Sequence, residues 1–193
     1  MWSIITFSGP SWSGKTTLTN LLSSTLWWYT LPENFTTRPP RPTDNEYTYL
    51  TKNQYFEMLY RNELIEILHY NDNYYGIKEP TNDQTVMAID VIALPQIIKY
   101  ALMDNHYHHS FYIDLPQSVI EKRMKMRWEN ESMIATREKN DKISSIIWPR
   151  LCDSVIDGSW TPQECLKECL SKLDKRFLKR HQQEFLEAFA THY

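Results

Sequence analysis

Glycine and cysteine are scarce in this chain, and long apolar runs are missing. Only four glycines and three cysteines occur among the 193 residues. Three cysteines exclude a framework of paired disulfides and favour reduced thiols. No apolar stretch approaches the roughly 20 residues of a membrane-spanning helix, and no basic segment followed by an apolar run marks a secretory signal. We therefore expect a cytoplasmic protein that does not associate with membranes.

Positive charge is not in excess either. The formal net charge is −3, which argues against a nucleic-acid binder held by phosphate contacts. We expect small-molecule partners, with the protein a monomer or a homodimer. Hydrophobic residues make up 41% of the chain, enough for one domain with a sizeable core.

Two groups of potential metal ligands are interpreted as ordinary residues. Cys165 and Cys169 lie four apart on a predicted helix, and we interpret them as plain thiols rather than a metal or redox pair. His106, His108 and His109 precede a predicted strand without carboxylates or cysteines at zinc-ligand spacing, which predicts a solvated loop.

The chain places two of its four glycines in one short motif. Residues 9–16 read Gly-Pro-Ser-Trp-Ser-Gly-Lys-Thr, a complete G-x-x-x-x-G-K-[ST] phosphate loop. An apolar strand pattern precedes it and a helical pattern follows it, so backbone amides and a helix N-terminus would surround a triphosphate. In such a loop Lys15 reaches the β- and γ-phosphates, and the Thr16 hydroxyl binds Mg²⁺. The predicted phosphate-binding set is Gly9, Pro10, Ser11, Trp12, Ser13, Gly14, Lys15, Thr16 and Thr17.

Strand and helix patterns alternate along most of the chain. Strands are predicted at 2–7, 85–90, 110–114 and 153–157, and helices at 15–26, 91–103, 116–127, 132–147, from 162 onward and at 175–190. Pro95 requires its helix to begin late or to kink, and Thr161 followed by Pro162 is typical of a helix start. This alternation predicts an α/β fold, a parallel sheet with helices on both faces.

Residues 34–79 interrupt the alternation and predict an insertion with its own small mixed α/β structure. Arg38 and Arg41 lie three apart on a segment stiffened by prolines, and two pre-positioned guanidinium groups suit a phosphate monoester. Tyr47 and Tyr75 offer hydroxyl donors, and Gly76 is predicted at a tight turn. Glu66 interrupts an apolar strand, so it either faces solvent or binds a ligand.

Together these motifs resemble those of guanylate kinases, in the nucleoside monophosphate kinase group of P-loop proteins. The resemblance covers about residues 4–173 and depends most on four pieces in the family's order: Ser8-Gly9-Pro10-Ser11 with Ser13-Gly14-Lys15-Thr16, Thr36-Thr37-Arg38 with Pro40-Arg41, Ile65-Glu66, and Asn73-Tyr74-Tyr75-Gly76. The resemblance implies a core at 1–33 and 80–193 with a helical lid at about 123–140. Within this core range, a C-terminal helical extension at about 174–193 is predicted from its amphipathic pattern and lies outside the resemblance. Residues 34–79 become the insertion that binds the nucleoside monophosphate (NMP).

The resemblance also implies roles for individual residues. It implies that ATP and Mg²⁺ are used, that Thr16 binds the metal, and that Asp90 contacts either guanine or, through water, the metal. Glu66 would accept the guanine N1–H and N2–H₂ groups, a pair of donors that adenine lacks. The implied NMP-binding set is Asn34, Arg38, Arg41, Tyr47, Glu66, Tyr75, Ile77 and Asp90. The implied catalytic set is Lys15, Arg41, Arg123, Arg127 and Arg137.

Four positions depart from the family pattern. Trp12 and Ile77 stand where glycine and a small hydroxyl residue are usual, and Asn34 and Gly158 replace a common serine and a common asparagine. Trp12 would be strained if its position needs a positive φ. Because most of these changes concern the base, a modified deoxynucleotide remains an alternative substrate.

The expected activity is ATP-dependent phosphorylation of GMP or dGMP by direct in-line transfer, which requires positioning and charge neutralisation more than a general base. One alternative is a P-loop kinase of similar fold that acts on another nucleotide or on a phosphorylated sugar. The other is a non-catalytic binding domain, which the intact phosphate loop disfavours.

Overall fold

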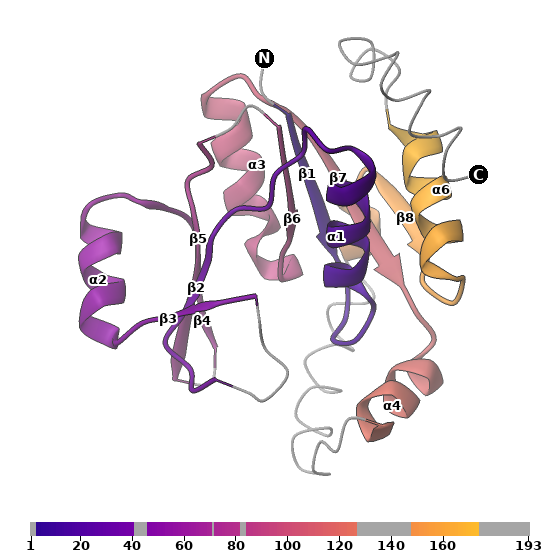
Figure 1. The fold of residues 1–193 in the computed structure, drawn as a ribbon, viewed down its shortest axis with the longest axis horizontal. Coiled ribbons are helices and arrows are strands. Elements are labelled where there is room, and N and C mark those ends of the chain that lie inside the picture. Colours follow the sequence, from indigo (N-terminus) through magenta and orange to yellow (C-terminus); the bar gives the residue numbers. More distant parts are fainter. Residues whose placement is uncertain (1–2, 41–45, 71, 82–83, 127–147, 174–193) are drawn as a thin grey trace.

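The computed structural model describes residues 3–40, 46–70, 72–81, 84–126 and 148–173. It is built on two sheets (Figure 1). The first is parallel throughout and has the strand order β6-β1-β7-β8. Its strands are β1 (Ser3–Ser8), β6 (Gln84–Ala88), β7 (Tyr107–Asp114) and β8 (Ser154–Asp157).

Helices cover both faces of the parallel sheet, as the sequence predicts (Figure 1). Helices α1 (Lys15–Thr25) and α6 (Pro162–Lys172) pack beside each other on one face. Helix α3 (Leu94–Met103), which follows the short 3-10 turn η1 (Val91–Ala93), covers the other face. Helix α4 (Gln117–Met126) follows β7, and a second 3-10 turn η2 (Trp148–Arg150) precedes β8.

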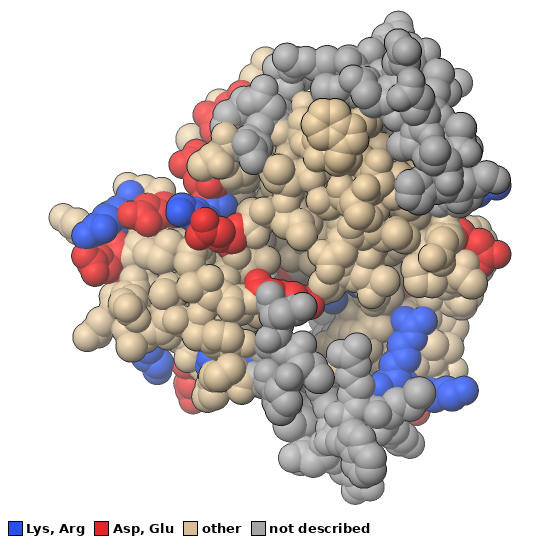
Figure 2. Space-filling view, in the orientation of Figure 1, with Lys and Arg blue, Asp and Glu red and all other residues tan. Residues whose placement is uncertain are grey.

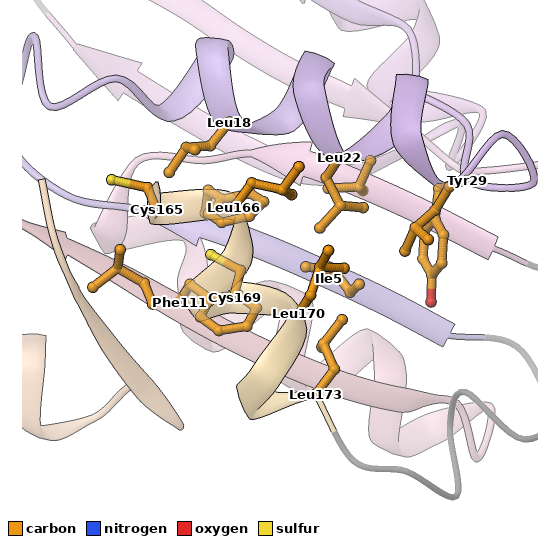
Figure 3. Packing of buried hydrophobic residues seen from close by; sticks show 14 of the residues in the cluster. Ile5, Leu18, Leu22, Tyr29, Phe111, Cys165, Leu166, Cys169, Leu170 and Leu173 are labelled. Carbon is orange, nitrogen blue, oxygen red and sulfur yellow. The ribbon is translucent and has the colours of Figure 1, made fainter. Parts of the chain in front are cut away.

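Alternating side chains of β1 divide the core into two layers. All six residues of this strand are buried. Ile5 joins the α1–α6 layer, where it packs with Leu22 and Leu166 (Figure 3). Ile4 points to the opposite face and packs in the layer that contains Ile97 of α3. The strand therefore shows no alternation of buried and exposed positions, because both of its faces are covered.

Local signals fix several element boundaries. Thr161 caps α6 in a reciprocal capping box with Glu164, and Pro162 occupies the first turn. Pro95 lies in the first turn of α3, so that helix begins late, as the sequence indicates. The predicted helix at 132–147 and the C-terminal helix at 175–190 lie outside the described residues.

The second sheet is mixed and has the order β3-β2-β5-β4. Its strands are β2 (Asn34–Thr36), β3 (Thr48–Tyr49), β4 (Leu64–Tyr70) and β5 (Asn73–Lys78), and helix α2 (Lys52–Tyr60) lies beside it. Tyr55 of α2 is fully buried, and its hydroxyl donates to the Tyr75 carbonyl over 2.8 Å. The prediction of a tight turn at Gly76 was wrong. Gly76 lies inside β5, where an added Cβ would be 2.9 Å from Cδ1 of Leu64.

The prediction of a solvated histidine loop was also wrong, because β7 begins earlier than the sequence indicates. His108 and His109 lie within this strand, and His109 is only 9% exposed. The ring of His109 is 3.1 Å from the Ser154 hydroxyl, and the ring of His108 is 3.1 Å from the Thr6 hydroxyl. Burial lowers the pKa of His108 to about 4, so this ring is neutral at pH 7.

Within the described residues, every helix is too short or too polar to cross a lipid bilayer. The three cysteines are all free, and Cys165 and Cys169 are both buried in the α1–α6 layer. Their interpretation as plain thiols agrees with this placement.

Candidate active site

The phosphate loop connects β1 to α1 and takes its shape from three residues with positive φ. These are Gly9 (φ +147°), Trp12 (φ +66°) and Gly14 (φ +99°). Gly9 is also required by space, because a Cβ there would lie 2.7 Å from the Ile113 carbonyl oxygen. Ser13 is buried, and its amide donates to the Pro10 carbonyl over 3.2 Å, which closes the turn. Ser11 is half-buried and Thr17 is exposed on α1.

The N-terminus of α1 is open to an anion. Over the described residues, Gly14 provides no side-chain cap and the first turn contains no acidic residue. The Lys15 ammonium lies over the loop and donates to the carbonyls of Gly9 and Pro10, 2.9 Å from each. A loop with this ammonium at its mouth and a helix N-terminus beneath is suited to phosphate.

Trp12 connects the phosphate loop to α4. Its ring packs with Leu115 and Ile120. Its carbonyl accepts a hydrogen bond from Nη1 of Arg123 over 2.9 Å, and Nη2 of the same guanidinium donates to the Gly158 carbonyl over 3.3 Å. Gly158 is required there because a Cβ would lie 2.7 Å from Cγ2 of Ile113. The positive φ expected to strain Trp12 is therefore present, and packing and hydrogen bonding hold the residue in place.

The hydroxyl of Thr16 meets a carboxylate that is not among the predicted site residues. Thr16 Oγ1 donates to Oε2 of Glu46 over 3.1 Å. Glu46 belongs to the 34–79 segment, 30 residues away, and its neighbour is Tyr47. This contact brings the two parts of the molecule together at the phosphate loop. Figure 2 shows a hollow between these parts with acidic side chains at its rim.

Arg38 is buried in a group of aromatic rings. It is 8% exposed, and its guanidinium carbon lies 5.2 Å from the ring centre of Tyr47 and 5.9 Å from that of Tyr49. Its Nη1 donates to the Pro39 carbonyl over 3.1 Å. Tyr47 also packs edge-on against Tyr75, with ring centres 6.1 Å apart. The structure thus brings together three of the residues predicted to bind a monophosphate.

Glu66 is a buried carboxylate near this group. A β-bulge between Leu64 and Glu66 interrupts the pairing of β4 with β5. The side chain is 5% exposed, and among the described residues it makes no hydrogen bond or ion pair. Burial raises the pKa of Glu66 to about 8, with a smaller contribution from the nearby charge of Asp90. Of the two alternatives left by the sequence, the solvent-facing one is excluded.

Two other residues of the predicted NMP-binding set are aligned with Glu66 across the second sheet. Asn34 of β2 pairs with Ile77 of β5, and Ile77 pairs with Glu66 of β4. Asn34 is half-buried and Ile77 is 3% exposed. Asp90 is exposed after β6, and its side chain accepts the Ile92 amide at the start of η1.

Three predicted catalytic arginines, Arg41, Arg127 and Arg137, lie outside the described residues. Glu46 is the residue that sequence reasoning missed. Glu46 and Thr16 are 30 residues apart in the sequence and meet only in the folded chain. The one sequence signal that could have drawn attention to Glu46 is its position beside Tyr47.

A sequence model of guanylate kinases matches residues 2–146, about three quarters of the chain. The chain belongs to the guanylate kinase family. Guanylate kinases of Nitrobacter winogradskyi and Bacteroides thetaiotaomicron are 39% identical over 72 residues and 35% identical over 108 residues. The first match covers 36% of this chain and 33% of the relative, and the second covers 50% and 53%. In these two matches, this chain spans about a third and about a half of the length of the relative.

Solved structures agree on the fold. The crystal structure of guanylate kinase from Anaplasma phagocytophilum aligns with a TM-score of 0.66 at 17% identity, covering 94% of this chain and 86% of that one. A gluconokinase from Sinorhizobium meliloti 1021 aligns with a TM-score of 0.55 at 16% identity, covering 94% and 97%. The α/β fold of a P-loop nucleoside monophosphate kinase, predicted from the sequence, is confirmed.

Proposed function

We propose that the protein transfers the γ-phosphoryl group of ATP to GMP or dGMP, forming GDP or dGDP. The observation that carries this proposal is the contact between Thr16 and Glu46. It brings the phosphate loop next to the segment that contains Tyr47, and Tyr47 packs on Arg38. Direct phosphoryl transfer needs a donor cradle and an acceptor cradle that face each other across a short distance.

The acceptor base is proposed to be guanine because of Glu66. A buried carboxylate without a hydrogen-bond partner costs free energy, and a ligand that offers two adjacent donors recovers it. Guanine offers N1–H and N2–H₂ side by side. Adenine lacks this pair and would leave the carboxylate unsatisfied, so the same side chain favours one base and disfavours the other.

The donor site is proposed to use Lys15 and the loop amides for the phosphates of ATP. Mg²⁺ fits beside Thr16, where a hydroxyl and a carboxylate oxygen lie 3.1 Å apart, and it would neutralise phosphate charge during transfer. Arg41, Arg127 and Arg137 are proposed to stabilise the transferring group. Arg123, whose guanidinium holds the carbonyls of Trp12 and Gly158, is proposed to position the phosphate loop instead. In this proposal residues 34–79 form the NMP-binding insertion, and a lid at about 123–140 excludes water from the core formed by 1–33 and 80–193.

The free thiols suit a reducing, cytoplasmic compartment.

The deciding experiment is a product assay with ATP, Mg²⁺ and a panel of ribo- and deoxynucleoside monophosphates. We expect ADP together with GDP or dGDP, and little turnover of AMP, CMP or UMP. The Lys15→Met protein serves as the control for contaminating kinases. Absence of turnover with every nucleotide in the panel would contradict the proposal.

One observation favours a second candidate substrate. Ile77 puts a buried apolar side chain between Asn34 and Glu66, where the family pattern has a hydroxyl residue. A guanine analogue with an apolar substituent, such as a modified deoxynucleotide, would suit this surface. Faster turnover of such an analogue than of dGMP in the same panel would support this substrate.

A further inference from the structure

We propose that Glu46 is a direct ligand of the Mg²⁺ that accompanies ATP, bound next to the Thr16 hydroxyl. The inference rests on the proposed kinase function and names a residue of the insertion as part of the metal site of the core. It follows from the geometry of the Thr16–Glu46 pair and from the charge of its surroundings.

The distance between the two oxygens is the first argument. Mg²⁺ binds oxygen ligands at about 2.0–2.1 Å in an octahedron, so two ligands at 90° are about 3.0 Å apart. Thr16 Oγ1 and Glu46 Oε2 are 3.1 Å apart. A metal ion can therefore take the position between them with almost no movement of either side chain, and the hydroxyl lone pair then faces the metal while its proton turns away.

Charge is the second argument. A carboxylate beside a triphosphate site is unfavourable unless a cation lies between them, because like charges at close range repel. Glu46 is placed at this point by its own hydrogen bond to the phosphate loop. The Lys15 ammonium lies at the same loop, on the Gly9 and Pro10 carbonyls. Glu46 should thus weaken binding of a nucleotide without metal and strengthen binding of the same nucleotide with metal.

Because Glu46 directly precedes Tyr47 in the chain, metal binding by Glu46 would also affect the proposed acceptor cradle. The next residue, Tyr47, packs against both Arg38 and Tyr75, which form the proposed acceptor cradle. Metal binding by Glu46 would restrain the position of the segment that carries Tyr47. Binding of MgATP would then position the acceptor cradle as well as the donor phosphates.

The test compares ADP binding by calorimetry with saturating Mg²⁺ and with EDTA. Glu46→Gln keeps the size of the side chain and an oxygen that accepts from Thr16, but it removes the charge. We expect the ratio of the two affinities to fall about tenfold in this variant, the lower end of the effect of perturbing a metal site. Glu57→Gln is the matched control, because Glu57 is an exposed carboxylate on α2 paired with Arg61, and its ratio should equal that of the wild type.

A second readout reports the ligand directly. With Mn²⁺ in place of Mg²⁺, Glu46→Ala, which has no side-chain oxygen, should add about one water to the metal–ADP complex, measured by water-proton relaxation. An unchanged affinity ratio in Glu46→Gln with unchanged Mn²⁺ hydration in Glu46→Ala would overturn the inference while leaving the kinase proposal intact. If the wild-type protein binds no ADP under either condition, the kinase proposal itself fails, and this inference fails with it.

Discussion

The protonation of Glu66 should control how tightly the protein binds GMP. The pKa of this buried carboxyl is about 8, so at pH 7 most molecules of the free protein carry it neutral. Accepting two hydrogen bonds from guanine requires the ionised form. Binding at neutral pH must therefore release a proton, and the observed affinity should rise with pH until Glu66 ionises in the free protein.

The magnitude follows from the ionised fraction. With a pKa of about 8 the carboxyl is about one-tenth ionised at pH 7 and one-half ionised at pH 8. The affinity for GMP should therefore rise about fivefold over this interval, with about 0.9 proton released per GMP at pH 7. The phosphate of GMP contributes little, because its second pKa is near 6.

Calorimetry in buffers with different ionisation enthalpies measures both quantities. Glu66→Gln is the control, since it cannot ionise and should show an affinity that hardly changes from pH 7 to pH 8. Three groups interact electrostatically with Glu66. Asp90 raises the pKa of Glu66, and Glu66 in turn contributes to the raised pKa values of the Tyr47 and Tyr55 hydroxyls. An equal pH dependence in wild type and Glu66→Gln would refute the assignment of Glu66 as the base-reading carboxylate.

The same shift makes a prediction for stability. The folded-state pKa of Glu66 lies above its ordinary value of 4.5. The contribution of this group to the free energy of unfolding is therefore fully present below pH 4.5 and is lost as pH rises towards 8. Relative to Glu66→Gln, the wild type should lose about 3 kcal/mol between pH 5 and pH 8. Urea unfolding of both proteins at the two pH values measures this difference, and equal changes in the two would contradict the burial of the charge.

Three further predictions concern the phosphate loop. Lys15→Met should lower the rate of phosphoryl transfer by about a hundredfold or more with an unchanged unfolding midpoint, and normal turnover would refute its role. Trp12→Gly should be more stable than Trp12→Ala by about 1 kcal/mol in urea unfolding, because both lose the packing on Leu115 and only alanine keeps the strain of φ +66°; the reverse order would contradict that strain. Gly9→Ala should be less stable than Gly14→Ala, since only at Gly9 would the new Cβ meet another residue, 2.7 Å from a carbonyl oxygen; equal stabilities would show that the loop can shift to make room.

The sequence predicts well those parts of the molecule that depend on neighbouring residues. The run from β1 through the loop to α1 has its own local signals, namely an apolar strand, two glycines and an amphipathic helix. The capping box at Thr161 is equally local. Because such signals act over a few residues, their outcome does not depend on what packs against them.

Features that depend on tertiary contacts could not be predicted. His108 and His109 read as polar loop residues because their hydroxyl partners, on β1 and β8, are remote in sequence. Glu66 was ambiguous because strand alternation alone cannot indicate the bulge that precedes it. The contact of Thr16 with Glu46 joins α1 to a non-strand residue of the 34–79 segment and leaves no periodic signal.

Trp12 shows how a tertiary contact replaces a missing glycine. A non-glycine residue in the left-handed region costs about 1–2 kcal/mol, and here the ring packs on α4 while Arg123 holds the carbonyl at 2.9 Å. These contacts offset the strain, and they also tie α4 to the phosphate loop and to Gly158. If the segment at about 123–140 closes over ATP, Arg123 must stay in place for the loop to keep its shape. The hinge of the proposed lid is therefore expected on the C-terminal side of Arg123, with this residue acting as its fixed anchor.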